Sequence, residues 1–284
     1  MARQLLGKEV TAALNEKIKK QVAQLVEKGI TPTLGIIRVG EQESDISYER
    51  GAQKRCETLG VACKKIVLPQ QASQTEVMAA IDKVNKDCGI HGVLLFRPLP
   101  GHLDQEAIIA ALDPGKDVDG MTDGSMAGVF TGKTLGFPPC TAQACMEILD
   151  FYGIDCAGKQ AVVVGRSLVV GKPVAMMLLQ KHATVTVCHT RTIAMPAVVK
   201  TADIVIVAAG RAGVVEDTYV SPGQIIIDVG INVNEEGRLC GDVDYAKVEP
   251  VVAAITPVPG GVGSVTTSVL VGHVVEAALR TLQL

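Results

Sequence analysis

The sequence predicts an α/β fold of two domains, each with a parallel sheet covered by helices on both faces. Two observations lead to this prediction. Apolar runs typical of buried strands alternate with segments of helical periodicity along most of the 284 residues. A stretch without periodicity, residues 113–139, is rich in glycine and proline and separates two such alternating regions. Long loops of this kind usually serve function.

The first region begins with apolar residues at helical spacing between Val10 and Val26. Ser73 and Glu76 have the spacing of a capping box, which marks the start of a helix. Strands are expected at 34–39, 66–68 and 92–96, and further helices at 44–59, 73–84 and 105–112.

The second region begins after a helix expected at 141–151. Its strands are expected at 161–164, 184–188, 204–208, 225–229 and 252–255, with a helix at 174–181. The apolar tail, 265–282, predicts a last helix, which the pattern allows to pack on either domain.

Composition excludes several classes of protein. The net charge is −3, aromatic residues make up 3% and Trp is absent, so neither a basic stripe nor stacking platforms for nucleic acid are expected. The eight cysteines contain no Cys-x-x-Cys pair, so we expect reduced thiols and no metal site. Residues 1–10 lack the apolar core of a secretory signal, and no apolar run is long enough to cross a bilayer. A cytoplasmic protein without membrane or nucleic-acid partners is therefore expected.

A glycine-rich turn, Gly165 to Gly171, joins the strand at 161–164 to the helix that follows. Such a turn presents free backbone N–H groups and the positive end of a helix dipole, which suit a phosphate. Ser167 takes the place of the middle glycine of the standard dinucleotide fingerprint. A tight turn that merely allows close packing is the alternative, and we favour phosphate binding because strand, turn and helix follow in the required order.

The strand at 184–188 predicts the choice of dinucleotide. Its end should lie beside the adenosine ribose, where NAD-specific sites usually have an acidic residue. Here Thr190 and Arg191 follow instead, and Arg166 lies in the glycine turn. Guanidinium and hydroxyl groups suit a 2′-phosphate, so NADP is favoured, while NAD remains possible if Arg191 is only a surface charge. Small residues after two later strands, at Gly210 and before Ile231, would let a flat ring approach the backbone.

Several longer motifs stand out along the chain. They are Lys116-Asp117-Val118-Asp119-Gly120, Pro139-Cys140-Thr141, Gly165-Arg166-Ser167 with Val170-Gly171-Lys172-Pro173, Ile227-Asp228-Val229-Gly230-Ile231-Asn232, and Thr256-Pro257-Val258-Pro259-Gly260-Gly261-Val262-Gly263. In the order and spacing of these motifs the chain resembles the methylenetetrahydrofolate dehydrogenase/methenyltetrahydrofolate cyclohydrolase family, over essentially its whole length.

The resemblance implies two domains with a cleft between them. Residues 1–139, completed by the C-terminal segment 264–284, would form the folate-binding catalytic domain, and residues 140–263 the Rossmann-like cofactor domain. Homodimers are usual in the family. Its dehydrogenase oxidises 5,10-methylenetetrahydrofolate to the 5,10-methenyl cation with NAD(P)+, and its cyclohydrolase hydrates that cation to 10-formyltetrahydrofolate.

The resemblance also implies roles for single residues. Tyr48 matches the tyrosine along the folate ring, and Asp119 matches the acid that accepts hydrogen bonds from the pterin; both are catalytic candidates. A half-buried helix tyrosine and a simple Asp-Gly turn are the alternatives. The remaining substrate candidates are Leu95, Phe96, Arg97, Pro259, Gly260, Gly261 and Val262. The cofactor candidates are Gly165, Arg166, Ser167, Thr190, Arg191, Gly210 and Ile231.

Two positions depart from the family. The lysine linked to hydrolysis would stand four residues after Tyr48, where this chain has Ala52. Lys54 is a poor substitute, since six helical steps turn a side chain by ~120° from Tyr48. Phe96 replaces the glutamine that supports the lysine.

We therefore expect an NADP-dependent dehydrogenase with weak or absent cyclohydrolase activity. A bifunctional enzyme that uses another base, and a catalytically silent nucleotide- or folate-binding protein, are the alternatives. Arg97 should point away from the reacting carbon or pair with a carboxylate, because a cation would oppose formation of the methenyl cation.

Overall fold

The computed structural model describes residues 1–282, and these form two compact units. Unit 1 consists of Met1–Ala12 and Thr141–Thr266, and unit 2 consists of Ala13–Cys140 with the chain from Thr267 onwards. The first residues belong to unit 1 because their backbone pairs there: Gly7 donates its N–H to the carbonyl of Gly260 at 2.9 Å. The last two positions of the expected segment 264–284 lie outside the described residues.

Unit 2 contains a parallel sheet of three strands in the order β3-β2-β4. The strands are β2 (Thr33–Val39), β3 (Ala62–Leu68) and β4 (Gly92–Leu95), and the helices between them are α2 (Glu43–Leu59), α3 (Gln74–Lys86) and α4 (Gln105–Ala111). The capping box expected at Ser73 and Glu76 is present with both of its hydrogen bonds. β3 starts four residues earlier than expected, because only its end is apolar enough to be recognised in the sequence.

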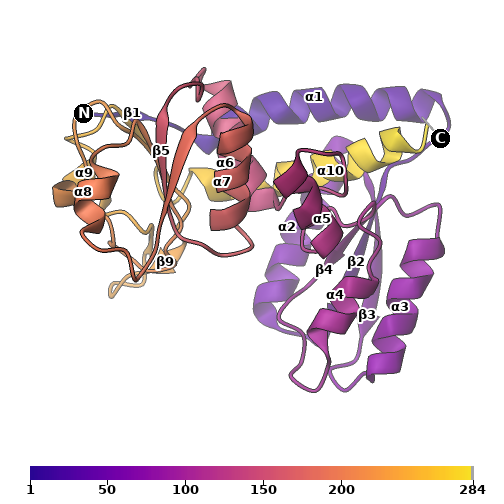
Figure 1. The fold of residues 1–284 in the computed structure, drawn as a ribbon. Coiled ribbons are helices and arrows are strands. Elements are labelled where there is room, and N and C mark those ends of the chain that lie inside the picture. The colour runs from indigo at the N-terminus through magenta and orange to yellow at the C-terminus, as the bar shows by residue number, and fades with distance from the viewer. Residues whose placement is uncertain (283–284) are drawn as a thin grey trace. The chain divides into compact units, whose positions relative to one another are not determined.

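Alternate residues of β2 face opposite sides of the sheet. Ile37 and Val39 join a core with residues of α3 and α4, whereas α2 contacts β2 and β3 and buries Ala52, Cys56 and Leu59. Figure 1 shows α3 and α4 side by side along the sheet. The prediction of helices on both faces is thus confirmed for this unit, and the carboxyl ends of its strands are left free for loops.

The segment 113–139 is not entirely a loop, and the expectation is wrong for α5 (Asp123–Thr131). The side chain of Thr122 caps the start of this helix by accepting from the N–H of Ser125, and Gly132 ends it with a φ of 69°. The glycines inside the helix hid it, because glycine is a weak helix former. Gly128 is needed there, since a Cβ on it would lie 2.1 Å from the carbonyl oxygen of Leu135.

Unit 1 contains a six-stranded sheet in the order β1-β11-β8-β7-β5-β6, and every neighbouring pair is parallel. The strands are β1 (Arg3–Gln4), β5 (Gln160–Val164), β6 (Thr184–Cys188), β7 (Ile204–Val207), β8 (Ile225–Asp228) and β11 (Ala254–Ile255). Five of the six follow the sequence expectation. β1 was missed because two exposed polar residues carry no strand pattern. A short antiparallel hairpin, β9 (Asn232–Val233) with β10 (Leu239–Cys240), was also missed.

Helices flank this sheet as well. α7 (Gly171–Gln180) contacts β5 and β6, and α6 (Cys140–Phe151) precedes β5 in the chain. The short helices α8 (Met195–Val199) and α9 (Tyr245–Val248) contribute Val199 and Val248 to a core with β5, β7 and β8. The last helix, α10 (Thr266–Arg280), packs in unit 2, where Gly272 comes close to Ile18 of α1 (Gly7–Glu27). Among the described residues, no helix combines the length and apolarity that crossing a bilayer requires.

Candidate functional site

The strand order of unit 1 fixes where a ligand fits. From β5 the chain continues first to β6 on one side and later to β7 on the other, so the topological switch point lies between β5 and β7. Ligands of open parallel sheets bind outside the carboxyl ends of the strands at this point. Gly165 follows β5 there, and a Cβ on it would lie 2.2 Å from the carbonyl oxygen of Ala208, which follows β7. Only glycine permits this approach of the two backbones.

The glycine turn after β5 is held open by one serine. The Oγ of Ser167 accepts from the N–H of Val170 at 3.1 Å, and its carbonyl oxygen accepts from the N–H of Lys172 at 3.0 Å. Residues 167–169 are exposed, and within the described chain, 1–282, no acceptor is found for their backbone N–H groups. A turn with free donors at the start of α7 is what a phosphate of a dinucleotide requires, so the residues fit that group.

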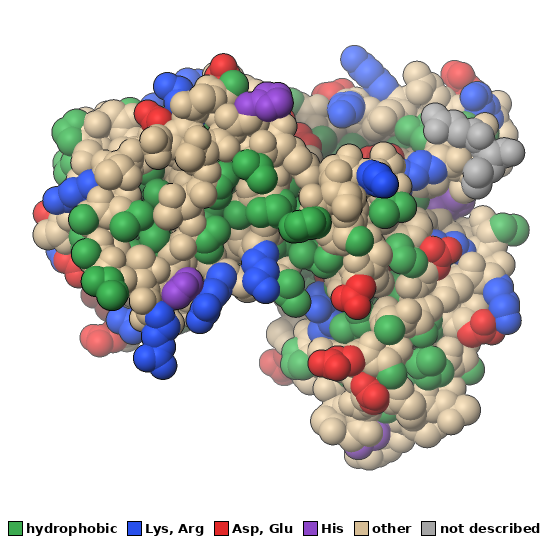
Figure 2. Space-filling model, in the orientation of Figure 1, with side chains coloured by type: hydrophobic (Ala, Val, Ile, Leu, Met, Phe, Trp, Pro, Cys, Tyr) green, Lys and Arg blue, Asp and Glu red, His purple; other side chains and the backbone are tan. Residues whose placement is uncertain are grey.

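The parallel sheet brings the predicted cofactor residues to one edge. Because all strands run the same way, the loops after β5, β6, β7, β8 and β11 meet at their carboxyl ends. Arg166, Thr190, Arg191 and Gly210 are found on these loops, with both arginines exposed, and Ile231 keeps 68% of its surface exposed. In Figure 2, Lys and Arg side chains gather with a histidine on the lower side of the part that holds β5 to β9.

A buried aspartate, for which the sequence predicts no role, connects the loops after β8 and β11. Asp228 ends β8 and accepts from the N–H groups of Gly230, Asp242 and Val243 at 2.9 to 3.0 Å. Burial raises the pKa of Asp228 to about 6, and the three N–H donors oppose that rise. Thr256 joins the next loop to the same strand end, donating its hydroxyl to the carbonyl of Asp228 at 3.3 Å and accepting from its N–H at 2.8 Å.

The loop after β11 contains the predicted substrate residues Pro259 to Val262. This loop and the loop after β8 together line a cavity of about 280 Å³. Ile231 and Leu239 are among the residues that line it. Pro259 and Gly260 are exposed, whereas Val262 is buried and anchors the loop. A Cβ on Gly261 would lie 2.6 Å from the carbonyl oxygen of Pro257, so this tight fold depends on glycine.

In unit 2, an ion cluster fixes the helix that carries Tyr48. Glu49, the next residue of α2, is buried and accepts from Arg38 of β2 at 3.0 Å and from Lys65 of β3 at 2.8 Å. Burial alone would raise the pKa of Glu49, but the bonds from Lys65 and Arg38 outweigh it and lower the pKa below its usual value. The helix is thus tied to two strands beside Tyr48.

Phe96 and Tyr48 contact each other. Phe96 follows β4 and is 8% exposed, and its ring meets that of Tyr48 edge-on with 5.9 Å between the centroids. Leu95 is 1% exposed and packs in the core with α3 and α4, so of the three predicted residues at this strand end it is Phe96 and Arg97 that lie beside Tyr48 and Asp119.

Asp119 is the carboxyl group of this cluster. Asp117 forms a parallel bridge with Val93 of β4, which places Asp119 beside the strand end. Arg97 lies 3.5 Å from the carboxylate of Asp119, so the alternative in which Arg97 pairs with a carboxylate is the one found. Burial raises the pKa of Asp119 to about 6, the charge of Arg97 opposes the rise, and the nearby Asp117 adds to it.

Cys140 and Thr267, which both belong to unit 2, lie close to Tyr48 and Asp119. Tyr48 keeps 40% of its surface exposed, but desolvation of its hydroxyl, followed by the proximity of Cys140 and Asp119, raises its pKa, while a hydrogen bond with Thr267 lowers it. The Cys140 thiol is buried, lies 3.2 Å from the carbonyl oxygen of Val118, and has a raised pKa because of that burial. In the sequence Cys140 stands out only as part of the motif Pro139-Cys140-Thr141, and nothing in the pattern of the tail helix distinguishes Thr267.

Ala52 and Lys54 lie on different faces of α2, as helix geometry predicts. Ala52 is fully buried in α2, and Lys54 is exposed on another face of the same helix. No lysine therefore takes the place of the missing one at Ala52 within α2.

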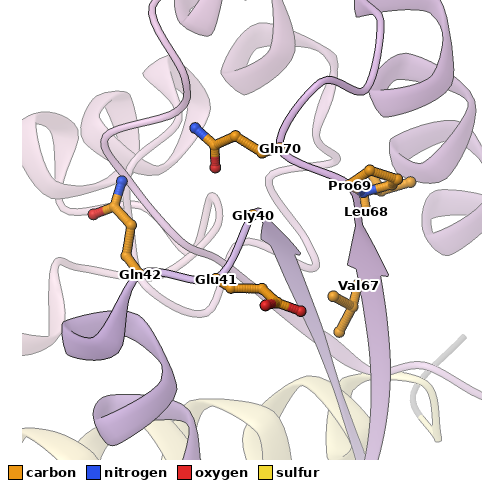
Figure 3. A pocket seen from close by; sticks show the side chains of 7 residues that line it. All are labelled: Gly40, Glu41, Gln42, Val67, Leu68, Pro69 and Gln70. Atoms are coloured by element: carbon orange, nitrogen blue, oxygen red, sulfur yellow. The ribbon is translucent and has the colours of Figure 1, made fainter.

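A second pocket of about 720 Å³ opens at the carboxyl ends of β2 and β3 (Figure 3). Gln42 and Gln70 stand at its rim, with Glu41 and Val67 below them. Gln70 occupies the space that a side chain at Gly40 would need. None of the residues predicted for substrate or cofactor lines this pocket.

A glycine turn with free donors at a switch point is typical of the dinucleotide-binding part of an α/β protein, and unit 2 adds a tyrosine beside a half-buried carboxyl group. The chain belongs to the tetrahydrofolate dehydrogenase/cyclohydrolase family. Residues 5–119 match the family's catalytic domain, and residues 139–282 match its NAD(P)-binding domain. The family expected from the motifs is therefore confirmed.

Relatives and solved structures agree with this assignment. A bifunctional protein FolD from Carboxydothermus hydrogenoformans is 51% identical over 279 residues, which is 98% of this chain and 97% of the relative. The crystal structure of the bifunctional FolD enzyme from Campylobacter jejuni aligns with a TM-score of 0.95 at 37% identity, over 99% of this chain and 100% of that one. The Trypanosoma brucei FolD structure with NADP and an inhibitor aligns at 0.91 and 32% identity, over 100% and 99% of the two chains.

Proposed function

We propose that this protein oxidises 5,10-methylenetetrahydrofolate to the 5,10-methenyl cation with NADP+, and that its cyclohydrolase activity is weak or absent. The dehydrogenase part is supported by the family, by the open glycine turn and by Tyr48 beside Asp119. The loss of hydrolysis is supported by one observation above all. Where a hydrolytic lysine is expected there is a buried Ala52, and the ring of Phe96 lies against Tyr48.

The two reactions ask different things of the side chains. When bound, NADP+ accepts the hydride, so the chain's own residues only bind and orient the folate and exclude water. In this proposal Tyr48 lies along the folate ring, and Asp119 accepts hydrogen bonds from the pterin. Adding water to the methenyl cation also requires proton transfer by a titratable group. An alanine and a phenylalanine cannot supply it.

Arg97 fits the dehydrogenase for an electrostatic reason. An unpaired guanidinium near the one-carbon unit would disfavour the cationic product. Its position 3.5 Å from the carboxylate of Asp119 offsets that charge and keeps the carboxylate ionised over a wider pH range. The pair thus supports pterin binding without a free cation in the site.

The choice of NADP is supported by Arg166 and Arg191, which are exposed on the loops after β5 and β6. A guanidinium on either loop suits a 2′-phosphate, and no carboxylate follows β6 to hold ribose hydroxyls. The family also leads us to propose a homodimer, which sedimentation at assay concentration tests.

A second candidate is a bifunctional enzyme that uses Asp119 as the base. The observation in its favour is the pKa of about 6, which allows this carboxyl group to exchange a proton near neutral pH. Its pairing with Arg97 argues against that role, because the ion pair stabilises the carboxylate and so makes it a weaker base.

One assay tests the proposal. The protein is supplied with 5,10-methylenetetrahydrofolate and NADP+, and NADPH and the methenyl product are followed together. We expect the two to accumulate in equal amounts. NADPH formed without accumulation of the methenyl product would support the bifunctional candidate, and no NADPH with either dinucleotide would leave only a binding protein.

A further inference from the structure

The loops at the carboxyl ends of β7 and β8 are held by a single side chain. Asp242 is fully buried in the segment that follows β10. Its Oδ2 accepts from the N–H of Gly210 at 2.8 Å, and its Oδ1 accepts from the N–H of Arg211 at 3.0 Å. The same Oδ1 accepts from the side-chain amide of Asn232 at 2.9 Å. One carboxylate therefore receives three donors from two separate loops.

The backbone around Asp242 is itself fixed. Its N–H donates to Asp228 at the end of β8 at 3.0 Å, and its carbonyl oxygen accepts from Val215 at 3.2 Å. Two glycines leave the room that these aspartates need. A Cβ on Gly230 would lie 2.4 Å from Oδ1 of Asp242, and a Cβ on Gly241 would lie 1.8 Å from Oδ2 of Asp228.

The two loops held in this way carry predicted cofactor contacts. Gly210 follows β7 beside the switch point, and Ile231 follows β8 and lines the 280 Å³ cavity. Loops that bind a ligand lose conformational freedom when it binds, so a group that orders them beforehand raises affinity. A buried carboxylate suits this task, because each N–H it accepts is a charge-assisted bond shielded from water.

We propose that Asp242 is a positioning residue for the dinucleotide, which holds the loops after β7 and β8 together in the arrangement that binds the cofactor. It does not touch the reacting atoms. The inference rests on the proposed function, since it takes NADP as the ligand of this edge of the sheet.

The test compares Asp242→Asn with a matched control. The amide keeps the size of the side chain but turns an NH₂ group toward one of the donors. Asp203→Asn is the control, because Asp203 also accepts a backbone N–H, from Gln160 at 2.8 Å, but at the amino end of β5. Two quantities are measured on the purified full chain without folate: the dissociation constant of NADP+ by calorimetry, and amide hydrogen exchange of residues 208–213 and 229–233.

Asp242→Asn should weaken NADP+ binding by about tenfold or more, as expected for loss of charge-assisted hydrogen bonds. It should speed exchange in both segments together, whereas Asp203→Asn should change neither quantity near the cofactor edge. An Asp242→Asn chain that binds NADP+ within about twofold of the wild type, or whose exchange rises in only one segment, would overturn the inference.

A second variant covers the case in which Asp242→Asn does not fold. Asn232→Ala removes one of the three hydrogen-bond donors to Asp242. It should speed amide hydrogen exchange in residues 229–233 and weaken NADP+ binding by a smaller factor than Asp242→Asn does. Unchanged exchange and binding in this variant would also overturn the inference. The proposed function fails separately, if the wild type binds NADP+ but does not reduce it with methylenetetrahydrofolate.

Discussion

The ring of Phe96 meets the ring of Tyr48 edge-on, with 5.9 Å between the centroids and 83° between the planes. Phe96 neither donates nor accepts a conventional hydrogen bond, so this side of Tyr48 is apolar. One helical turn beyond Tyr48, Ala52 fills a buried position with a methyl group. The proposed loss of hydrolysis depends on Phe96 and Ala52.

Restoring the lysine and glutamine should restore hydrolysis. We expect the double variant Ala52→Lys, Phe96→Gln to consume methenyltetrahydrofolate faster than the wild type, while each single variant gains little because the glutamine supports the lysine. Placing a lysine at a fully buried alanine should also lower stability, by about 1–3 kcal/mol from overpacking. Methenyl decay and thermal melting measure the two effects.

Lys54→Ala is the control for this experiment. Lys54 is exposed on another face of α2, so its removal should change neither reaction. A wild type that hydrolyses methenyltetrahydrofolate and a Lys54→Ala variant that does not would show that Lys54 reaches the substrate, and would contradict the assignment of Ala52.

Arg97 should set the acid limb of the pH profile. Burial raises the pKa of Asp119 to about 6 and Arg97 opposes that rise, so only above this pH is the carboxylate largely ionised to accept from the pterin. Arg97→Gln should move the acid limb of kcat/KM to higher pH, and Arg97→Lys should move it less. If the acid limb of kcat/KM lies at the same pH in Arg97→Gln and in the wild type, this ion pair does not set it.

The same carboxyl group should make stability depend on pH. The pKa of Asp119 is about 6 when folded against an ordinary value of 3.8, so between these values the folded chain keeps a proton that the unfolded chain has lost. Stability from this group is full below about pH 4 and is lost as the pH rises to about 6, on the order of 3 kcal/mol for two pKa units. Relative to Asp119→Asn, the wild type should become less stable over this range in urea titrations. A constant difference between the two would contradict the raised pKa.

Arg191→Ala should discriminate between the dinucleotides. Losing a guanidinium–phosphate contact typically weakens binding by roughly tenfold or more, so the KM for NADP+ should rise by about that factor while the KM for NAD+ changes little. Arg166→Ala should act in the same direction. Equal effects on both cofactors would assign the two arginines to a phosphate that NAD also carries, and the preference for NADP would have to be abandoned.

Gly165→Ala should damage the glycine turn. Gly165 has a φ of 136°, and a Cβ would lie 2.2 Å from the carbonyl oxygen of Ala208, so either the turn or the end of β7 must shift. We expect loss of dinucleotide binding and a lower melting temperature. Gly153→Ala is a useful comparison, because Gly153 also has a positive φ but nothing lies within 4 Å of the added Cβ. It should lower stability without changing affinity for NADP+.

Much of this fold is predictable because its signals are local. The central strands β5, β7 and β8 are buried along nearly their whole length, so they stand out in the sequence as apolar, β-branched segments. The glycine turn is visible for a related reason, since strand, turn and helix adjoin in the sequence. β1 escapes prediction because its two residues are polar and exposed, and the hairpin of β9 and β10 because each of its strands has only two residues and neither is buried.

The site is only partly predictable, because some of its signals are local in the sequence and others are not. The positions of Tyr48, Asp119 and the glycine turn follow from motifs, but the contacts between them do not. Nothing in the sequence indicates that Arg97 reaches Asp119, or that Asp242 holds both Arg211, 31 residues before it, and Asn232, 10 residues before it. These relationships depend on how strands far apart in the chain adjoin in the sheet.

The loss of hydrolysis is tested by supplying 5,10-methenyltetrahydrofolate alone, with no dinucleotide, and following its decay at increasing protein concentration. Because Ala52 and Phe96 leave the site without the hydrolytic pair, we predict a decay rate equal to that in buffer at every concentration, in a preparation that reduces NADP+ with methylenetetrahydrofolate. A decay rate that rises in proportion to protein concentration would contradict it.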